Sequence, residues 1–314
     1  MQSSNANSLS AVHTPAHATP SRNSGVWPFV LGSMVLGTVG VFVHEAGAAP
    51  ITAVWFRSVF GLLGLGAWLL WRGQWSQLRL TRHTAPWALA SGACLVITWL
   101  MFFEAMAYIP ASMAIVLFHV QPLWLLLFGA LWLGEPVGKQ RWLAVLAALL
   151  GLALATGVLQ HLPVLGGNSA SAPGYWWGVG LCLAGALIFA AQILFTKKAA
   201  QVPASALAWW QCLVGAAVLW VGPVSSGWPA AGSWWWLAGL GLVHTALAYT
   251  LIYAGTTRLP VARIAILQYV YPAVALLIDW WYFDLQLSGL QLFGIVLMSA
   301  AIGYAERPQR GTAH

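Results

Sequence analysis

Long apolar runs separated by short polar breaks make up most of the chain. A helix that crosses a hydrocarbon core of about 30 Å needs roughly 20 apolar residues, and ten segments meet this requirement. Membrane-spanning helices are expected at 26–44, 51–71, 86–105, 110–133, 139–159, 174–196, 204–222, 234–256, 261–283 and 287–304. The pattern therefore predicts an all-α membrane protein with ten transmembrane helices.

Composition supports this interpretation. Of the 314 residues, 60% are hydrophobic and 6% are charged, whereas soluble domains contain about 25% charged residues. Cys94, Cys182 and Cys212 lie in apolar runs without metal-ligand or CxxC spacing, so no metal or cofactor is predicted. The net charge of +7 is spread along the chain, which indicates orientation in a lipid bilayer and no binding to nucleic acid.

Expected loops with basic residues alternate along the chain with expected loops that have none. With the N-terminus inside, eleven Lys and Arg residues fall on the cytoplasmic side, and the loops 44–50, 105–110, 160–173, 222–233 and 284–286 contain none. Cytoplasmic loops of membrane proteins carry such an excess. We therefore expect a multi-pass protein of a bacterial-type inner membrane with both termini in the cytoplasm. The sequence does not predict its oligomeric state.

The two halves of the chain repeat each other at an offset of 150 residues. Ile109-Pro110 corresponds to Leu259-Pro260, and Pro122 corresponds to Pro272, so that IPASMAIVLFHVQP aligns with LPVARIAILQYVYP. Because five helices per half is an odd number, the second half begins on the opposite side of the membrane. The expected architecture is two inverted five-helix repeats, the construction of secondary transporters whose site lies near the midplane.

The expected boundaries follow from this repeat. A disordered cytoplasmic tail covers 1–25, the first repeat 26–160, an external linker 161–173, the second repeat 174–305 and a cytoplasmic tail 306–314.

Residues 110–155 and 259–295 both resemble the end of an EamA domain, with a small-residue helix start, a mid-helix proline and, in the first half, the helix end Leu133-Gly134-Glu135. The resemblance covers almost the whole chain after residue 25 and points to the drug/metabolite transporter superfamily. It implies ten helices, cytoplasmic termini, and export or exchange of small metabolites, often amino acids. The second half departs from the pattern, because Leu285 stands at the position of Glu135 and Asp284 precedes it.

Candidate residues for a substrate cavity cluster near the expected midplane. His119 and Tyr269 each follow their helix-starting proline by nine residues, which places both about 13 Å into the membrane at about 1.5 Å per residue. Ionisable groups at this depth usually face a water-filled cavity, although a histidine bonded to a neighbouring helix is the alternative. The further candidates are Gln121, Gln268, Tyr271, Trp99, Phe103, Tyr249, Tyr253 and His244.

Three of the charged residues within or near the expected spans are candidates for charge pairing or coupling, namely Arg57, Glu104 and Asp279. Arg57 lies seven residues inside its span, where an unpaired guanidinium costs about 3 kcal/mol. Either Asp279 or Glu104 is a possible partner, and recognition of a substrate carboxylate is the other interpretation of Arg57. Asp279 shares one helical stripe with Gln268 and Tyr271, which favours a position facing the bundle. Its carboxylate is there a candidate either for binding an ammonium group or a proton, or for pairing with Arg57.

The sequence carries no enzyme signature. His44-Glu45 begins like a zinc-protease motif, but Ala48 stands where the second histidine is required. The favoured function is therefore a secondary exporter or exchanger of a small-molecule solute such as an amino acid, working by alternating access. A membrane-embedded enzyme and a non-transporting membrane sensor are the competing hypotheses.

Overall fold

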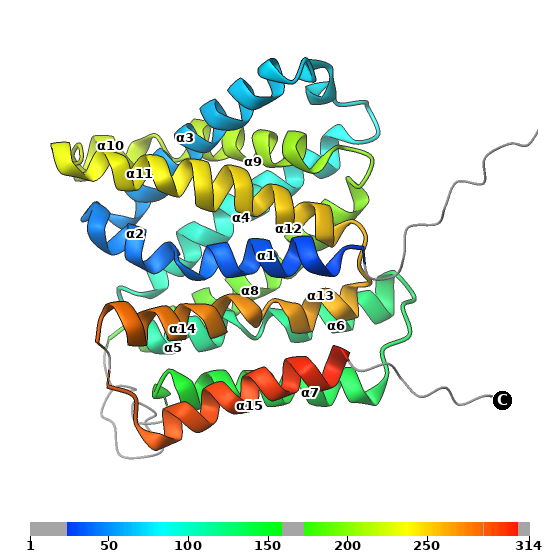
Figure 1. The fold of residues 1–314 in the computed structure, drawn as a ribbon, viewed down its shortest axis with the longest axis vertical. Helices are drawn as coiled ribbons and strands as arrows, with labels where there is room; N and C mark the ends of the chain where they lie inside the picture. The colour runs from blue at the N-terminus through cyan, green and yellow to red at the C-terminus, as the bar shows by residue number, and fades with distance from the viewer. Residues whose placement is uncertain (1–23, 159–172, 285, 307–314) are drawn as a thin grey trace, which may run out of the picture.

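The computed structural model describes residues 24–158, 173–284 and 286–306. Within these ranges the chain is a helical bundle without β-strands (Figure 1). The expected tails 1–25 and 306–314 and the linker 161–173 lie outside the described residues, apart from Ser24, Gly25, Pro173 and Glu306.

The helices follow the expected apolar runs. In the first half they are α1 (Val26–Gly37), α2 (Val39–Ala46), α3 (Pro50–Trp71), η1 (Trp75–Leu78), α4 (Ala85–Ala105), α5 (Ala111–Phe118), α6 (Gln121–Trp132) and α7 (Lys139–Ala155). In the second half they are α8 (Tyr175–Lys198), α9 (Ala204–Val218), α10 (Val221–Ser226), η5 (Ala231–Ser233), α11 (Trp234–Gly241), η6 (Leu242–Leu247), α12 (Ala248–Thr256), α13 (Val261–Leu267), α14 (Val270–Tyr282) and α15 (Gly289–Glu306).

Eight helical segments of the described residues are long and apolar enough to cross a membrane. The other two expected spans, 139–159 and 204–222, contain α7 with 17 residues and α9 with 15 residues. Both are shorter than the eight. A count of ten spans therefore rests on the repeat and on the packing of these two helices within the bundle.

Equivalent helices of the two halves have equivalent neighbours. The first helix of each half packs along the third helix of the other half, as α1 against α12 and α8 against α4. The second helices, α3 and α9, pack together, and so do the fifth helices, α7 and α15 (Figure 1). The helices of each half thus pack mainly against helices of the other half.

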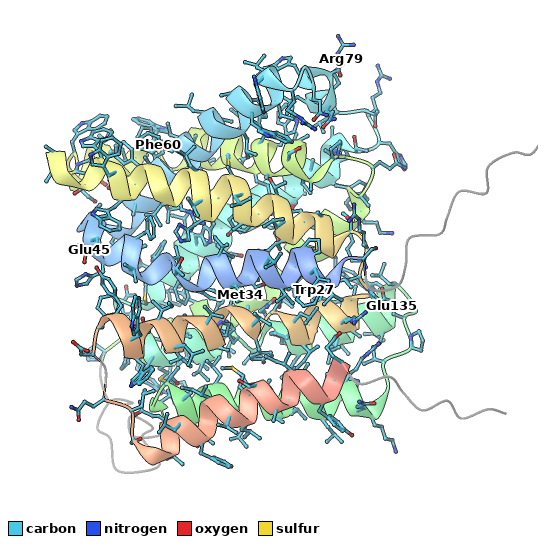
Figure 2. All side chains as sticks on the ribbon, viewed as in Figure 1. Trp27, Met34, Glu45, Phe60, Arg79 and Glu135 are labelled. Carbon is cyan, nitrogen blue, oxygen red and sulfur yellow. The ribbon has the colours of Figure 1, made fainter. Side chains whose placement is uncertain are left out.

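The two halves also begin at opposite ends of the bundle. Gly25, at the start of α1, approaches Leu259, whereas Gly178, in the first turn of α8, approaches the repeat-related Ile109. Arg79 and Glu135 lie at one end of the bundle and Glu45 lies at the other (Figure 2). Because α4 starts after Arg79 and crosses to the opposite end, α8 begins at the end where α1–α2 finishes.

Close backbone contact joins the fifth helices. A methyl group on Gly151 of α7 would lie 2.7 Å from the carbonyl oxygen of Gly294, and one on Gly294 of α15 would lie 2.5 Å from the carbonyl oxygen of Gly151. Small residues let helix backbones approach closely in membranes, where van der Waals packing drives association. This reciprocal pair fixes how the two halves meet at one edge of the bundle.

One expected helix of each half breaks near its middle, and the reason is the same in both. Pro122 and Pro272 lack an N–H and clash with the carbonyl four residues earlier. The helix accordingly breaks at His119-Val120, between α5 and α6, and at Gln268-Tyr269, between α13 and α14. The breaks bring the predicted midplane residues out of regular helix and leave main-chain groups free for other partners.

Candidate functional site

A cavity of about 420 Å³ lies between the two halves, within the range of ordinary small-molecule sites. Its wall draws on both repeats, from α1 and α3 to α12 and the break before α14. The predicted residues that line it are Arg57, Trp99, Phe103, His119, Gln121, Tyr249, Tyr253, Gln268 and Tyr271. Tyr269, His244, Glu104 and Asp279 are not among the lining residues.

The broken helices meet at the side of the cavity. Tyr269 is fully buried, and its hydroxyl donates a hydrogen bond of 2.9 Å to the main-chain carbonyl of His119. The Leu123 N–H bonds to the Val120 carbonyl, so this tyrosine replaces the helical partner of His119. Next to this bond in both segments, the Gln121 side-chain amide donates a hydrogen bond to the Gln268 side-chain oxygen. The bond between Tyr269 and His119 thus joins repeat-related positions of the two halves.

The His119 ring is held at both its edge and its face. Its Nδ1 lies 2.7 Å from the Ile115 carbonyl, so this nitrogen carries the proton and donates it to that oxygen. The ring stacks on Tyr271 with centroids 6.2 Å apart and planes inclined by 16°. The His119 ring is therefore part of the cavity wall, and its hydrogen bond runs to its own helix and not to a neighbouring one.

Arg57 projects from α3 into the cavity without a carboxylate partner. Its Nε donates to the Thr245 hydroxyl at 3.0 Å, and one terminal nitrogen lies 3.4 Å from the His244 carbonyl. The guanidinium carbon lies 5.1 Å from the centre of the Trp99 ring and 5.7 Å from that of Tyr249. Cation–π contacts and hydrogen bonds therefore hold the charge in place.

The two expected carboxylate partners of Arg57 lie elsewhere. No ion pair within 4.0 Å joins Arg57 to an acid in the part of the chain that the structure describes. Glu104 accepts a hydrogen bond of 3.2 Å from Tyr108 on the exposed surface. Asp279, on α14, faces Gly40 of α2, so its stripe does face the bundle. Main-chain and hydroxyl acceptors took the place of the carboxylate, and the sequence gives no sign of them.

A π-helical segment, η6, supplies these acceptors. The Thr245 hydroxyl donates to the Leu240 carbonyl five residues earlier at 2.9 Å and accepts from Arg57. The His244 ring is fully buried and lies 2.8 Å from the Thr38 hydroxyl, at the junction of α1 and α2. The structure therefore places the His244 side chain behind the cavity wall, while its main chain serves Arg57. Such π-turns inside helices are frequent at functional sites.

A buried polar network that the sequence analysis missed joins four helices beside the cavity. The Ser91 hydroxyl lies 2.9 Å from the Thr196 hydroxyl and accepts from Gln211 at 2.6 Å and from Gln192 at 3.2 Å. The Tyr253 hydroxyl donates to Gln211. Gln192, Thr196 and Tyr253 also line the cavity. These three side chains add polar groups to the cavity wall beyond Arg57, His119, Gln121 and Gln268.

The cavity differs at its two ends. Toward the Glu45 end its wall includes Val43, which is 38% exposed, and the exposed Pro50. Toward the Arg79 end it stops at Thr196 and Thr256, which are 0% and 3% exposed. At the first end the wall therefore includes residues of the exposed surface, whereas at the second, closed end it is made of buried residues.

Ionic contacts tie the closed end together. Glu135 accepts a hydrogen bond of 2.7 Å from the Val261 N–H, the start of α13, and lies 3.7 Å from the Lys197 ammonium. Arg263 donates to both carboxylate oxygens of Glu306, with Nε–O distances of 2.8 and 2.7 Å. Glu135 thus joins the first repeat to two segments of the second. Leu285, its counterpart by sequence, lies outside the described residues.

Comparison with known proteins gives a consistent result over most of the chain. The model of the EamA-like transporter family matches residues 23–157 and 176–305. A solved structure with 22% identity superposes with a TM-score of 0.79 over 91% of this chain and 98% of its own, which shows that the two share a fold.

Three relatives carry transporter names. The uncharacterized transporter YxxF of Bacillus subtilis is 23% identical over 305 residues, covering 96% of this chain and 95% of its own. The aromatic amino acid exporter YddG of Ancylobacter novellus is 27% identical over 265 residues, covering 82% and 88%. The pseudopaline exporter CntI of Pseudomonas aeruginosa is 34% identical over 130 residues, covering 41% and 44%.

Proposed function

The chain belongs to the EamA-like transporter family, and from this premise we propose that it is a secondary transporter. It exports or exchanges a small metabolite such as an amino acid, by alternating access to the cavity between the two repeats. The observation that carries the proposal is the cavity itself, whose wall combines Arg57 and His119 of the first repeat with Tyr249 and Tyr271 of the second.

The proposed topology has ten spans in a bacterial-type inner membrane. The end that holds Arg79 and Glu135 (Figure 2) is the cytoplasmic one, because the basic loops gather there. The start of α1 and the end of α15 lie at this same end (Figure 1), which agrees with an even number of crossings. The two short helices, α7 and α9, complete the count, since each packs along its repeat-related partner.

In the proposed orientation, the end of the cavity wall that includes exposed residues faces the outside and the buried end faces the cytoplasm. The exposed Val43 and Pro50 mark the outer opening, and the buried Thr196 and Thr256 mark the inner limit. Alternating access requires a second arrangement in which the contacts of Glu135 separate and the outer end closes. Equivalent packing of equivalent helices in the two halves provides for such an exchange, because the two arrangements are related by the repeat.

A resistance screen tests the proposal in cells. Overexpression of an exporter protects a host against toxic concentrations of its own substrate, so growth is compared over a panel of amino acids, amino acid analogues and other metabolites. Protection by the parent protein against at least one compound, with a lower intracellular content of that compound, supports export. A panel without protection, together with turnover of a compound by the purified protein in detergent, would favour a membrane enzyme instead.

A further inference from the structure

The cavity contains one full charge. Arg57 is positive, and among the described residues that line the cavity no other carries a permanent charge. All six acidic residues of the chain lie in the described ranges: Glu45, Glu104, Glu135, Asp279, Asp284 and Glu306. None of them lines the cavity. A solute inside it therefore meets a cation and no protein carboxylate.

Arg57 retains donors for a ligand. A guanidinium carries five N–H donors in a planar fork. In the described part of the chain the acceptors of its hydrogen bonds are the Thr245 hydroxyl and the His244 carbonyl. Two acceptors against five donors leave N–H groups available. The group that a guanidinium binds best is a carboxylate, through two parallel hydrogen bonds.

The repeat holds Arg57 between equivalent aromatic rings. Trp99 and Tyr249 differ by 150 in sequence position, and each lies within 6 Å of the guanidinium carbon. The second helices align at an offset of 153 residues, which pairs Pro50 with Pro203 and Arg57 with Trp210. The Trp210 indole N–H donates to the Leu78 carbonyl at 3.0 Å. The pseudo-symmetric cavity therefore has a single, off-axis anion site and no matching site for a second charge.

The rest of the wall suits an apolar body. Phe102, Phe103, Phe118, Phe189 and Ile252 line the same cavity as Arg57 and His119. Aromatic walls of this kind pack against flat or branched apolar groups. The neutral amides of Gln121 and Gln192 offer hydrogen bonds, but they give an ammonium group no opposite charge.

We infer that the transported solute is an organic monocarboxylate with an apolar, ring-sized body and no cationic group, its carboxylate on Arg57 and its body between the phenylalanines. The inference rests on the proposed function and excludes zwitterionic amino acids from its range of metabolites, because their ammonium group would enter a cavity without a counter-charge. Burial of an unpaired charge is costly. The Arg57 carboxylate site thus selects for net negative charge.

Four compounds of nearly one shape test this selection. They are 3-phenylpropanoate, its neutral amide 3-phenylpropanamide, the zwitterion phenylalanine and the cation 2-phenylethylamine. Binding to the purified protein in detergent is measured by calorimetry. We expect 3-phenylpropanoate to bind about 10- to 100-fold more tightly than each of the others, the gain from charge-assisted hydrogen bonds to one guanidinium.

Variants assign the preference to Arg57. Arg57→Gln should bring 3-phenylpropanoate to the affinity of its amide, and Arg57→Lys should keep part of the preference, because lysine retains the charge without the planar fork. Arg72→Gln, on an exposed residue at the other end of the same helix, is the matched control and should bind as the parent does. Size-exclusion chromatography and thermal unfolding confirm that each variant is folded.

The outcomes separate this inference from the proposed function. Equal binding of all four compounds, preference for phenylalanine or 2-phenylethylamine, or failure of the carboxylate to bind the parent protein overturns the inference. If Arg57→Gln does not fold, the four-compound series on the parent protein still decides. Transport of the zwitterion or the cation in proteoliposomes would support the proposed transporter and contradict the anion site. Selective binding of the carboxylate without transport of any solute would support the anion site and contradict the proposed transporter.

Discussion

The hydroxyl of Tyr269 donates a hydrogen bond of 2.9 Å to the main-chain carbonyl of His119, and the two residues occupy equivalent positions of the two repeats, 150 residues apart. Beside Pro122, the Leu123 N–H bonds to the Val120 carbonyl instead of the His119 carbonyl. The Tyr269 hydroxyl therefore supplies the donor that the His119 carbonyl lacks within its own helix. A side chain of one repeat therefore completes the backbone of the other at the level of the cavity.

Removal of this hydroxyl should weaken the centre of the protein. Tyr269→Phe leaves the His119 carbonyl without its partner in a dry environment, at a cost of about 1–2 kcal/mol. The expected result is a lower midpoint of thermal unfolding in detergent. Tyr304→Phe is the matched control, because the Tyr304 side chain is 46% exposed at the end of α15. Equal midpoints for the two variants would contradict the proposed role of the bond.

The contact between the fifth helices tolerates no side chain. Gly294→Val on α15 would drive two methyl groups toward the backbone of Gly151, where a single added carbon already lies 2.5 Å from the carbonyl oxygen. Overpacking of this kind costs about 2–3 kcal/mol. We expect a lower yield of folded protein and a lower unfolding midpoint. Gly303→Val on the same helix meets open space and should behave as the parent, so similar losses in both would disprove the contact.

Thr245 positions Arg57 through the π-helical segment. Thr245→Val keeps the shape of the side chain but removes the acceptor of the Arg57 Nε hydrogen bond, which leaves a charged donor unpaired. We expect a loss of about 1–3 kcal/mol in stability and a weaker affinity for the transported solute. Thr250→Val is the control, because the Thr250 hydroxyl of α12 donates to the Ala246 carbonyl four residues earlier and makes no contact with Arg57 among the hydrogen bonds of the described residues. An unchanged affinity in Thr245→Val would show that Arg57 needs no such support.

The inner closure depends on the charge of Glu135. Glu135→Gln removes the attraction to Lys197 and weakens the acceptor at the Val261 N–H. In a background without the three native cysteines, a cysteine at Thr256, which is 3% exposed, should react faster with a membrane-impermeant thiol reagent from the cytoplasmic side. Glu104→Gln, which alters an exposed contact at the outer end, is the control. An equal rate of thiol modification in the parent background, Glu135→Gln and Glu104→Gln would show that Glu135 does not keep the inner end closed.

Much of the architecture followed from the sequence because periodic apolar runs and prolines are local signals. His119 and Tyr269 were predicted to lie at one level, since both follow a helix-starting proline by the same number of residues, but the helix breaks beside them were not predicted. Their direct contact was not predicted, because it depends on how two distant helices cross.

Other features leave no local signal. The π-helical segment at Leu242–Leu247 has the apolar pattern of an ordinary helix, so the acceptors of Arg57 could not be foreseen. Ser91 belongs to a network that joins helices, whereas Ser33 bonds only to the Phe29 carbonyl of its own helix. A single serine in an apolar run permits either outcome, and only the packing of neighbouring helices decides.

Transport across a sealed bilayer tests the central claim most directly. Purified protein is reconstituted into proteoliposomes that contain an unlabelled solute, and uptake of the same labelled solute from outside is followed over time. The account predicts saturable, protein-dependent exchange for at least one small metabolite, beyond that of protein-free liposomes. Absence of exchange for every solute of a broad panel of amino acids and organic acids, with folded protein in the bilayer, would contradict it.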